Sequence, residues 1–183
     1  MIPPTASSAI PRRSGALMMV SIVVMLAGCA PTPEPTPTPT AVFASEEEAF
    51  AAAEETYRAY TDALNAIDPK NPKTFERTYE FSGGGFQSAD RENFSTMHAE
   101  GYVIDGDALV TRFVGKEVDE SLDRVVAVIC VDVSNVTIHD STGASVVNPN
   151  RPDVYEIEVT FKRDLDRLRI DSADRIEGTT CEG

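Results

Sequence analysis

The sequence contains only two histidines, His98 and His139, and three cysteines. A zinc centre is built from histidine and cysteine ligands, so we predict no metal site. His139 precedes Asp140, but successive residues of a strand point to opposite faces of the sheet. The two side chains are therefore no basis for a Ser-His-Asp triad. We predict no catalytic residues from these motifs and no cofactor.

Acidic motifs do not supply a metal site either. "DGD", residues 105–107, and "DLD", residues 164–166, resemble fragments of calcium-binding loops. Both lack the further oxygen ligands that such a loop places at regular spacing. We interpret both motifs as turns.

Positive charge is also scarce. The chain has 16 lysines and arginines against 30 aspartates and glutamates, and its formal net charge is −14. The only charged residues before Cys29 are Arg12 and Arg13. If residues 1–28 are removed, the net charge therefore becomes two units more negative. A surface of this sign repels phosphate backbones and anionic lipid headgroups. We therefore predict that nucleic acid is not a partner.

Long apolar runs are limited to "ALMMVSIVVMLAG", residues 16–28. A membrane-spanning helix needs about 20 apolar residues, so this run is too short to be a comfortable span. With Arg12 and Arg13 before it, residues 1–28 have the pattern of an export signal. The export route stays open, because the arginine pair is compatible with twin-arginine export but the following "SGAL" fits that motif poorly.

The end of the signal is more specific than its apolar part. "LAGC", Leu26 to Cys29, resembles the lipobox of bacterial lipoproteins. The resemblance implies cleavage after Gly28, acylation of Cys29 with lipid chains such as palmitate, and anchoring to the outer face of the cell membrane. Two acyl chains anchor a protein stably, whereas one is marginal. The alternative is a plain secretory signal followed by a free or disulfide-bonded Cys29.

Residues 29–44 form the expected tether. Proline occupies every second position from Pro31 to Pro39, which favours extended polyproline II structure. At about 3.1 Å per residue, this stretch holds the following domain on the order of 30 Å from its anchor. The threonines between the prolines are also possible sites for sugars.

The remaining residues, 45–183, form the expected globular domain. Ser45 and Glu48 have capping-box spacing, and a stripe of apolar residues from Phe50 to Ile67 predicts a long amphipathic helix. Shorter helices are expected after Asn71 and from Ser88, with "SGGGF", residues 82–86, as a helix stop and flexible loop. Period-two patterns then predict strands over residues 108–118, 123–139 and 153–163, followed by a hairpin turn over 164–167 and a last strand. The fold class is α+β, with N-terminal helices packed on an antiparallel sheet of about four strands.

This order of elements resembles the nuclear transport factor 2-like fold, a cone in which a curved sheet wraps the first helix. More narrowly, "VICVDVSNVTIHDSTG", a proline-containing loop, a strand hairpin and a terminal cysteine resemble actinobacterial lipoproteins of unassigned activity. The sequence departs from the fold's usual pattern in having Leu168 where tryptophan is frequent, and in showing no early hairpin.

With Cys29 acylated, Cys130 and Cys181 are left as a pair in an oxidising compartment, where we expect them to form a disulfide. Free thiols, with Cys130 as a small buried residue, are the alternative.

Cone-shaped folds of this kind can enclose a cavity. Candidates for its wall are Tyr57, Tyr60, Tyr155 and Phe161, together with Asp132, the one mid-strand acid that we select as a test for catalysis. The alternative is that these aromatic side chains only fill the core. The sequence thus favours a membrane-anchored, non-enzymatic module that binds an unknown protein or small molecule. The other hypothesis is an enzyme of the ketosteroid-isomerase or cyclase-like class, which rests on fold analogy alone.

Overall fold

The computed structural model describes residues 43–177 and Cys181. The expected signal at 1–28, the acylation site Cys29 and the tether up to residue 42 lie outside the described residues. Among those described, no helix combines the length and the apolar character needed to cross a bilayer. Residues 39–183 form a compact unit of their own, which contains the whole hydrophobic core and both disulfide cysteines. This segment is therefore suited to study as an isolated domain.

The first helix, α1, spans Glu46–Asn65 and begins where the capping box predicts. The Ser45 hydroxyl accepts from the Glu48 amide at 3.3 Å, while the Glu48 carboxylate accepts from the Ala44 amide at 2.7 Å. The first bond satisfies an amide that the first turn leaves without a helical partner, and the second ties the residue before the cap to the helix. The expected apolar stripe faces the sheet, with Tyr57 and Tyr60 buried.

Two further helical segments follow, a 3-10 helix over Pro72–Glu80 and α2 over Gly84–Ala99. The expected start of this third helix at Ser88 was wrong, because the glycine segment belongs to the helix. Gly84 has a φ of +52°, and a Cβ there would collide with the Asp171 carboxylate. Glycine at this position lets the start of α2 approach the sheet closely.

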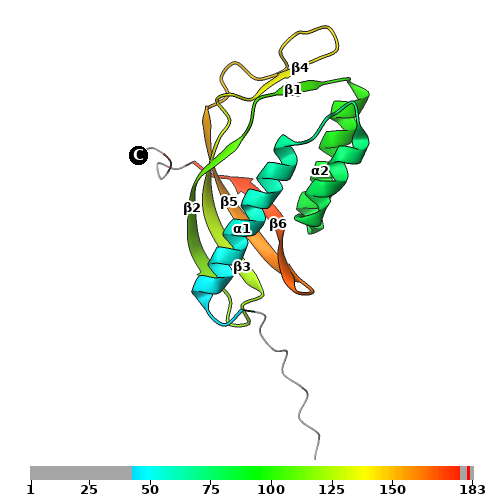
Figure 1. Cartoon of the computed structure of the whole chain (residues 1–183). Helices are drawn as coiled ribbons and strands as arrows, with labels where there is room; N and C mark the ends of the chain where they lie inside the picture. Colours follow the sequence, from blue (N-terminus) through cyan, green and yellow to red (C-terminus); the bar gives the residue numbers. More distant parts are fainter. Residues whose placement is uncertain (1–42, 178–180, 182–183) are drawn as a thin grey trace, which may run out of the picture. The chain divides into compact units, whose positions relative to one another are not determined.

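The main sheet is antiparallel, with the order β2-β3-β5-β6. Its strands are β2 (Leu109–Val118), β3 (Arg124–Asp132), β5 (Val154–Asp164) and β6 (Arg167–Arg175). Figure 1 shows α1 and α2 on one face of this curved sheet. The predicted fold class, helices packed on a curved antiparallel sheet of four strands, is confirmed.

The expected strand over 123–139 is in fact two strands. β3 ends at Asp132, whose carboxylate accepts from the Ser134 amide at 2.8 Å. The chain then turns, and β4 (Thr137–His139) pairs with the unexpected strand β1 (Val103–Asp105) in a separate two-stranded sheet. Apolar and polar residues alternate close to this turn on both of its sides. The alternation alone therefore does not show where β3 ends and β4 begins.

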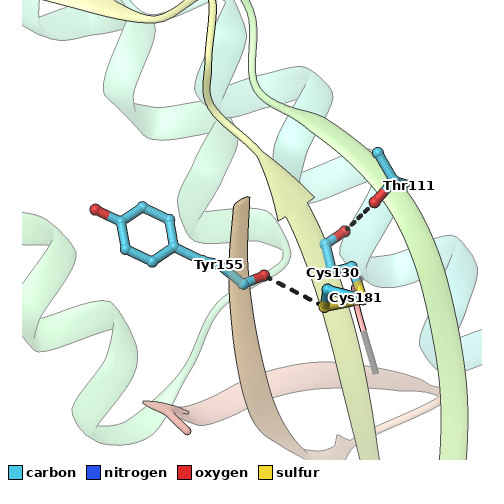
Figure 2. Close-up of a disulfide and its surroundings, with 4 residues drawn as sticks. All are labelled: Thr111, Cys130, Tyr155 and Cys181. Atoms are coloured by element: carbon cyan, nitrogen blue, oxygen red, sulfur yellow. Dashed lines mark hydrogen bonds between the residues drawn. A yellow bond between two sulfur atoms is a disulfide. The ribbon is translucent and has the colours of Figure 1, made fainter. Parts of the chain in front are cut away.

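The core lies between α1 and the sheet. Val125, Ala127, Ile129 and Val131 of β3 belong to the buried cluster that includes Tyr57 and Phe161. Val126, Val128 and Cys130 alternate with them and therefore face the other side of the sheet. There Cys130 and Cys181 form the disulfide that the sequence predicts, with Cα atoms 5.5 Å apart (Figure 2).

Candidate functional site

The interior of the cone is filled by aromatic rings. Tyr57 stands edge-on to Phe161 with ring centroids 6.5 Å apart, and Tyr60 stands edge-on to Phe86 at 5.3 Å. Phe161 is fully buried, and the two tyrosines are 6% and 5% exposed. Three of the proposed wall residues therefore come together as packed core, and none of them lines any of the principal pockets of the described residues.

Tyr155 lies elsewhere. Its ring stacks under the Arg175 guanidinium, with 4.4 Å between the guanidinium carbon and the ring centroid. It lines an outer groove with Ile138 and Arg151, and Figure 2 shows its ring pointing away from the disulfide. Because side chains alternate along a strand, Tyr155 points to the same face of the sheet as Phe161. Tyr155 lies near the start of β5, however, outside the part of the strand that pairs with β6. We correct its assignment to the cone wall.

Asp132 also differs from the expectation. It is the last residue of β3 rather than a mid-strand residue, and it caps the turn that follows. Hydrogen bonds from the Ser134 hydroxyl and amide hold the pKa of Asp132 below its usual range. A carboxylate that accepts two such bonds outside the core is a turn residue and not a general base in a cavity.

The carboxylate that the sequence reasoning missed is Asp90 of α2. It is 7% exposed, and its two oxygens accept from the Tyr60 hydroxyl at 3.1 and 3.2 Å. Burial raises the pKa of Asp90 to about 6, against the opposing effect of hydrogen bonds from Tyr60 and Ser82. The available signal was its spacing, because Asp90 lies four residues from both Phe86 and Phe94 on the apolar stripe of α2.

Neither histidine contributes to a site. His98 bonds the Pro69 carbonyl through Nδ1 at 2.7 Å, and His139 lies in β4. In the described part of the chain, no group of three or more histidine, cysteine, aspartate or glutamate side chains is arranged to hold a metal ion.

An apolar pocket of about 330 Å³ opens where α1 ends, beside the small β1–β4 sheet. The strands β1 and β4, which contribute to its lining, lie side by side in Figure 1. Its size is at the lower end of the range typical for small-molecule sites. Most of the residues that line it are apolar, namely Leu64, Ile67, Met97, Ile104, Ala108, Val133, Val136 and Ile138.

The polar part of this pocket is the turn Asp105–Gly106–Asp107 together with the side chain of Asn65. The side chain of Asn65 ties this turn to α1, since its Nδ2 donates to the Ala108 carbonyl and its Oδ1 accepts from the Ala108 amide, both at 2.9 Å. Gly106 has a φ of +81° and lies against the Asn135 carbonyl, where no Cβ would fit. The turn is thus held from two sides.

A larger groove, of about 850 Å³, lies beside the disulfide. Half of the residues that line it are charged, namely Asp153, Glu156, Arg175 and Glu177, and they lie beside Pro152, Val154, Ile176 and Cys181. Charged residues of both signs line this groove, whereas the charged residues of the smaller pocket are confined to Asp105 and Asp107. The smaller pocket is therefore the better candidate for a small-molecule site with an apolar wall.

No family model matches the chain, and no curated protein is a significant match. Solved structures do resemble it. The intermembrane space region of the chloroplast protein ARC6 aligns over 70% of this chain and 97% of its own, with 13% identity and a TM-score of 0.52. A "putative aromatic ring hydroxylase" from Novosphingobium aromaticivorans aligns over 73% and 93%, with 13% identity and a TM-score of 0.51. At this identity the likeness shows the fold alone, which is nuclear transport factor 2-like.

Proposed function

We propose that this chain is a lipid-anchored, extracytoplasmic binding module whose domain takes a small, largely apolar molecule in the pocket beside β1 and β4. The observation that carries the proposal is the division between a filled cone and an open apolar pocket. Aromatic side chains occupy the interior, whereas aliphatic side chains line the pocket.

The same division argues for binding rather than catalysis. An acid or base must reach the group whose proton it moves. Asp90, the carboxylate with a pKa near 6, bonds Tyr60 in the core and lines none of the principal pockets. Asp105 and Asp107 line the open pocket, but both are exposed to solvent, without the burial that tunes a catalytic carboxylate.

The anchor in this proposal is acylated Cys29. The lipobox-like "LAGC" and the proline-rich residues 31–40 support it, and the partner is then a lipid bilayer, at the outer face of an actinobacterial cell membrane. The test is metabolic labelling of the full-length chain and of Cys29→Ala with an alkyne analogue of palmitate. We expect label and membrane association in the wild type and neither in the variant. A wild-type chain without label would contradict the anchor.

The pocket is tested with segment 39–183 and the apolar probe N-phenyl-1-naphthylamine, which fluoresces on leaving water. Met97→Trp introduces a bulky ring at the pocket wall of α2, and Ser95→Trp places the same ring at an exposed position of that helix outside the lining. We expect saturable fluorescence with the wild type and Ser95→Trp, and its loss with Met97→Trp. An equal signal from both variants, or none from the wild type, would contradict binding in this pocket.

The alternative is a small-molecule enzyme of the ketosteroid-isomerase or cyclase-like class. The observation that favours it is Asp90 itself, since a carboxyl with a pKa of about 6 has the proton affinity of a general base at neutral pH. An enzyme of this kind requires a conformation in which Asp90 faces a cavity. Turnover of a ketosteroid that Asp90→Asn abolishes would favour this alternative over the binding module.

A further inference from the structure

We propose that the ligand of the apolar pocket is a cationic amphiphile, a small molecule with an aliphatic body and one protonated amine. This inference rests on the proposed binding function and adds the chemical class of the ligand. It follows from the two kinds of surface that the pocket presents, aliphatic walls and a single turn with two carboxylates.

The walls determine the body of the ligand. Three parts of the fold supply these walls. The end of α1 and the segment after it supply Leu64 and Ile67, β1 supplies Ile104, and β4 with the connection before it supplies Val136 and Ile138. Each of these side chains is only partly buried by the protein. Their remaining exposed surface is covered only when an apolar group enters the pocket, and removing such surface from water favours binding.

The turn determines the head. Asp105 and Asp107 both line the pocket, and the residues that line it include no lysine, arginine or histidine. Among the described residues, neither aspartate has an ion-pair partner or a side-chain hydrogen bond. Asn65, the other polar side chain of the lining, has its amide committed to Ala108. The pocket therefore offers a ligand two negative charges and no positive one.

The position of these charges is set before a ligand arrives. Asn65 holds the turn to α1 through two hydrogen bonds, and Gly106 presses its backbone against Asn135. A site that is already ordered loses less conformational entropy when it binds. An ammonium group fits this site because it supplies three donors and a charge of the opposite sign.

Other head groups fit less well. A carboxylate or phosphate head would meet two like charges, in a chain whose net charge is already −14, and like charges disfavour binding. A neutral hydroxyl would bond the carboxylates but gain no charge attraction. The expected order of affinity is therefore amine, then alcohol, then carboxylate.

The test uses segment 39–183 with bound N-phenyl-1-naphthylamine and three competitors of equal chain length: octylamine, 1-octanol and octanoate. At pH 7 and low salt, we expect octylamine to displace the probe at a concentration about fivefold lower than 1-octanol does. This ratio corresponds to the largest free energy that a single solvent-exposed ion pair typically contributes. Octanoate should be the weakest of the three. Asp105→Asn/Asp107→Asn should bind amine and alcohol about equally.

The matched control is Glu55→Gln/Asp62→Asn, which removes the same charge from exposed positions of α1 outside the lining. The control should keep the amine preference. Equal displacement by all three competitors in the wild type, or loss of the preference in the control as well, would overturn the cationic class while leaving the pocket as a binding site. A probe that does not bind the wild type at all would instead overturn the proposed function.

Discussion

The hydroxyl of Tyr60 on α1 donates to both carboxylate oxygens of Asp90 on α2, at 3.1 and 3.2 Å. Both residues are buried, at 5% and 7% exposure. This pair is the polar link between two helices whose other contacts in this region are aromatic, such as Tyr60 with Phe86. Because a buried carboxylate is costly when charged, the link makes the stability of the domain depend on pH.

The first prediction concerns that pH dependence. Burial raises the pKa of Asp90 from 3.8 to about 6, so between these pH values the folded chain binds more protons than the unfolded chain. Stability from this group is then fully present below about pH 4 and is lost as pH rises through 6. The loss in the free energy of unfolding between pH 4 and 7.5 should be on the order of 2–3 kcal/mol, and Asp90→Asn should abolish it.

The measurement is the free energy of unfolding of segment 39–183 from pH 4 to 7.5, by urea titration. The comparison is the difference between wild type and Asp90→Asn, because Asp119 and Asp140 have lowered pKa values and their effect on stability has the opposite sign. A difference that stays constant over this range would show that Asp90 titrates as an ordinary carboxyl.

The second prediction removes the donor. Tyr60→Phe leaves the Asp90 carboxylate without its tyrosine partner and should lower the free energy of unfolding by about 1–3 kcal/mol at pH 7. Tyr57→Phe is the control, since Tyr57 is buried to a similar extent but makes no side-chain hydrogen bond to a described residue. Its loss should be clearly smaller in the same urea titration, and equal losses would refute the role of the hydrogen bond.

The third prediction concerns the disulfide. Cys130 and Cys181 are 51 residues apart, and a link across a loop of this size stabilises a domain by roughly 4 kcal/mol in the chain-entropy model. Cys181→Ala should lower the melting temperature of segment 39–183 to that of the reduced wild type. If reduction and substitution left melting unchanged, the link would have no part in stability.

The fourth prediction tests the turn that carries the two carboxylates. Gly106→Ala introduces a Cβ that collides with the Asn135 carbonyl at a φ of +81°. We expect a loss of about 1–3 kcal/mol in stability and weaker binding of octylamine. Gly143→Ala is the matched control, because Gly143 has a similar φ of +85° but nothing within 4 Å of the added Cβ.

Both glycine variants place an alanine at a positive φ, but only Gly106→Ala also brings the new Cβ against Asn135. The difference between them therefore measures the effect of the collision alone. Urea titration of both should give a larger loss for Gly106→Ala, and only this variant should lose amine binding. Equal losses would mean that the turn is not pressed against Asn135.

Local patterns predicted the elements whose stabilising contacts are close in sequence. The capping box at Ser45 and Glu48 is a contact across three residues, and α1 begins there. The alternation of β5 follows from one face packing on the core, so Val159 and Phe161 are buried as expected. The disulfide followed from counting cysteines once Cys29 was assigned to lipid.

Contacts between distant segments defeated the same reasoning. The turn after Asp132 is set by the pairing of β4 with β1, some thirty residues upstream. The start of α2 depends on how Gly84 fits against Asp171 of β6. The spacing of Asp90 from Phe86 and Phe94 places it on the apolar stripe of α2, but that spacing does not show that Tyr60 of another helix supplies its hydrogen bond.

The sequence by itself determined the acidic charge, the α+β order of elements and the cysteine pair, and it predicts the anchor at Cys29, because each depends on composition or on neighbours along the chain. Only the tertiary structure decided that the aromatic residues fill the cone and that Asp105 and Asp107 border an apolar pocket. Whether a side chain fills space or lines it depends on the volume left between packed elements, and that volume is a property of the fold as a whole.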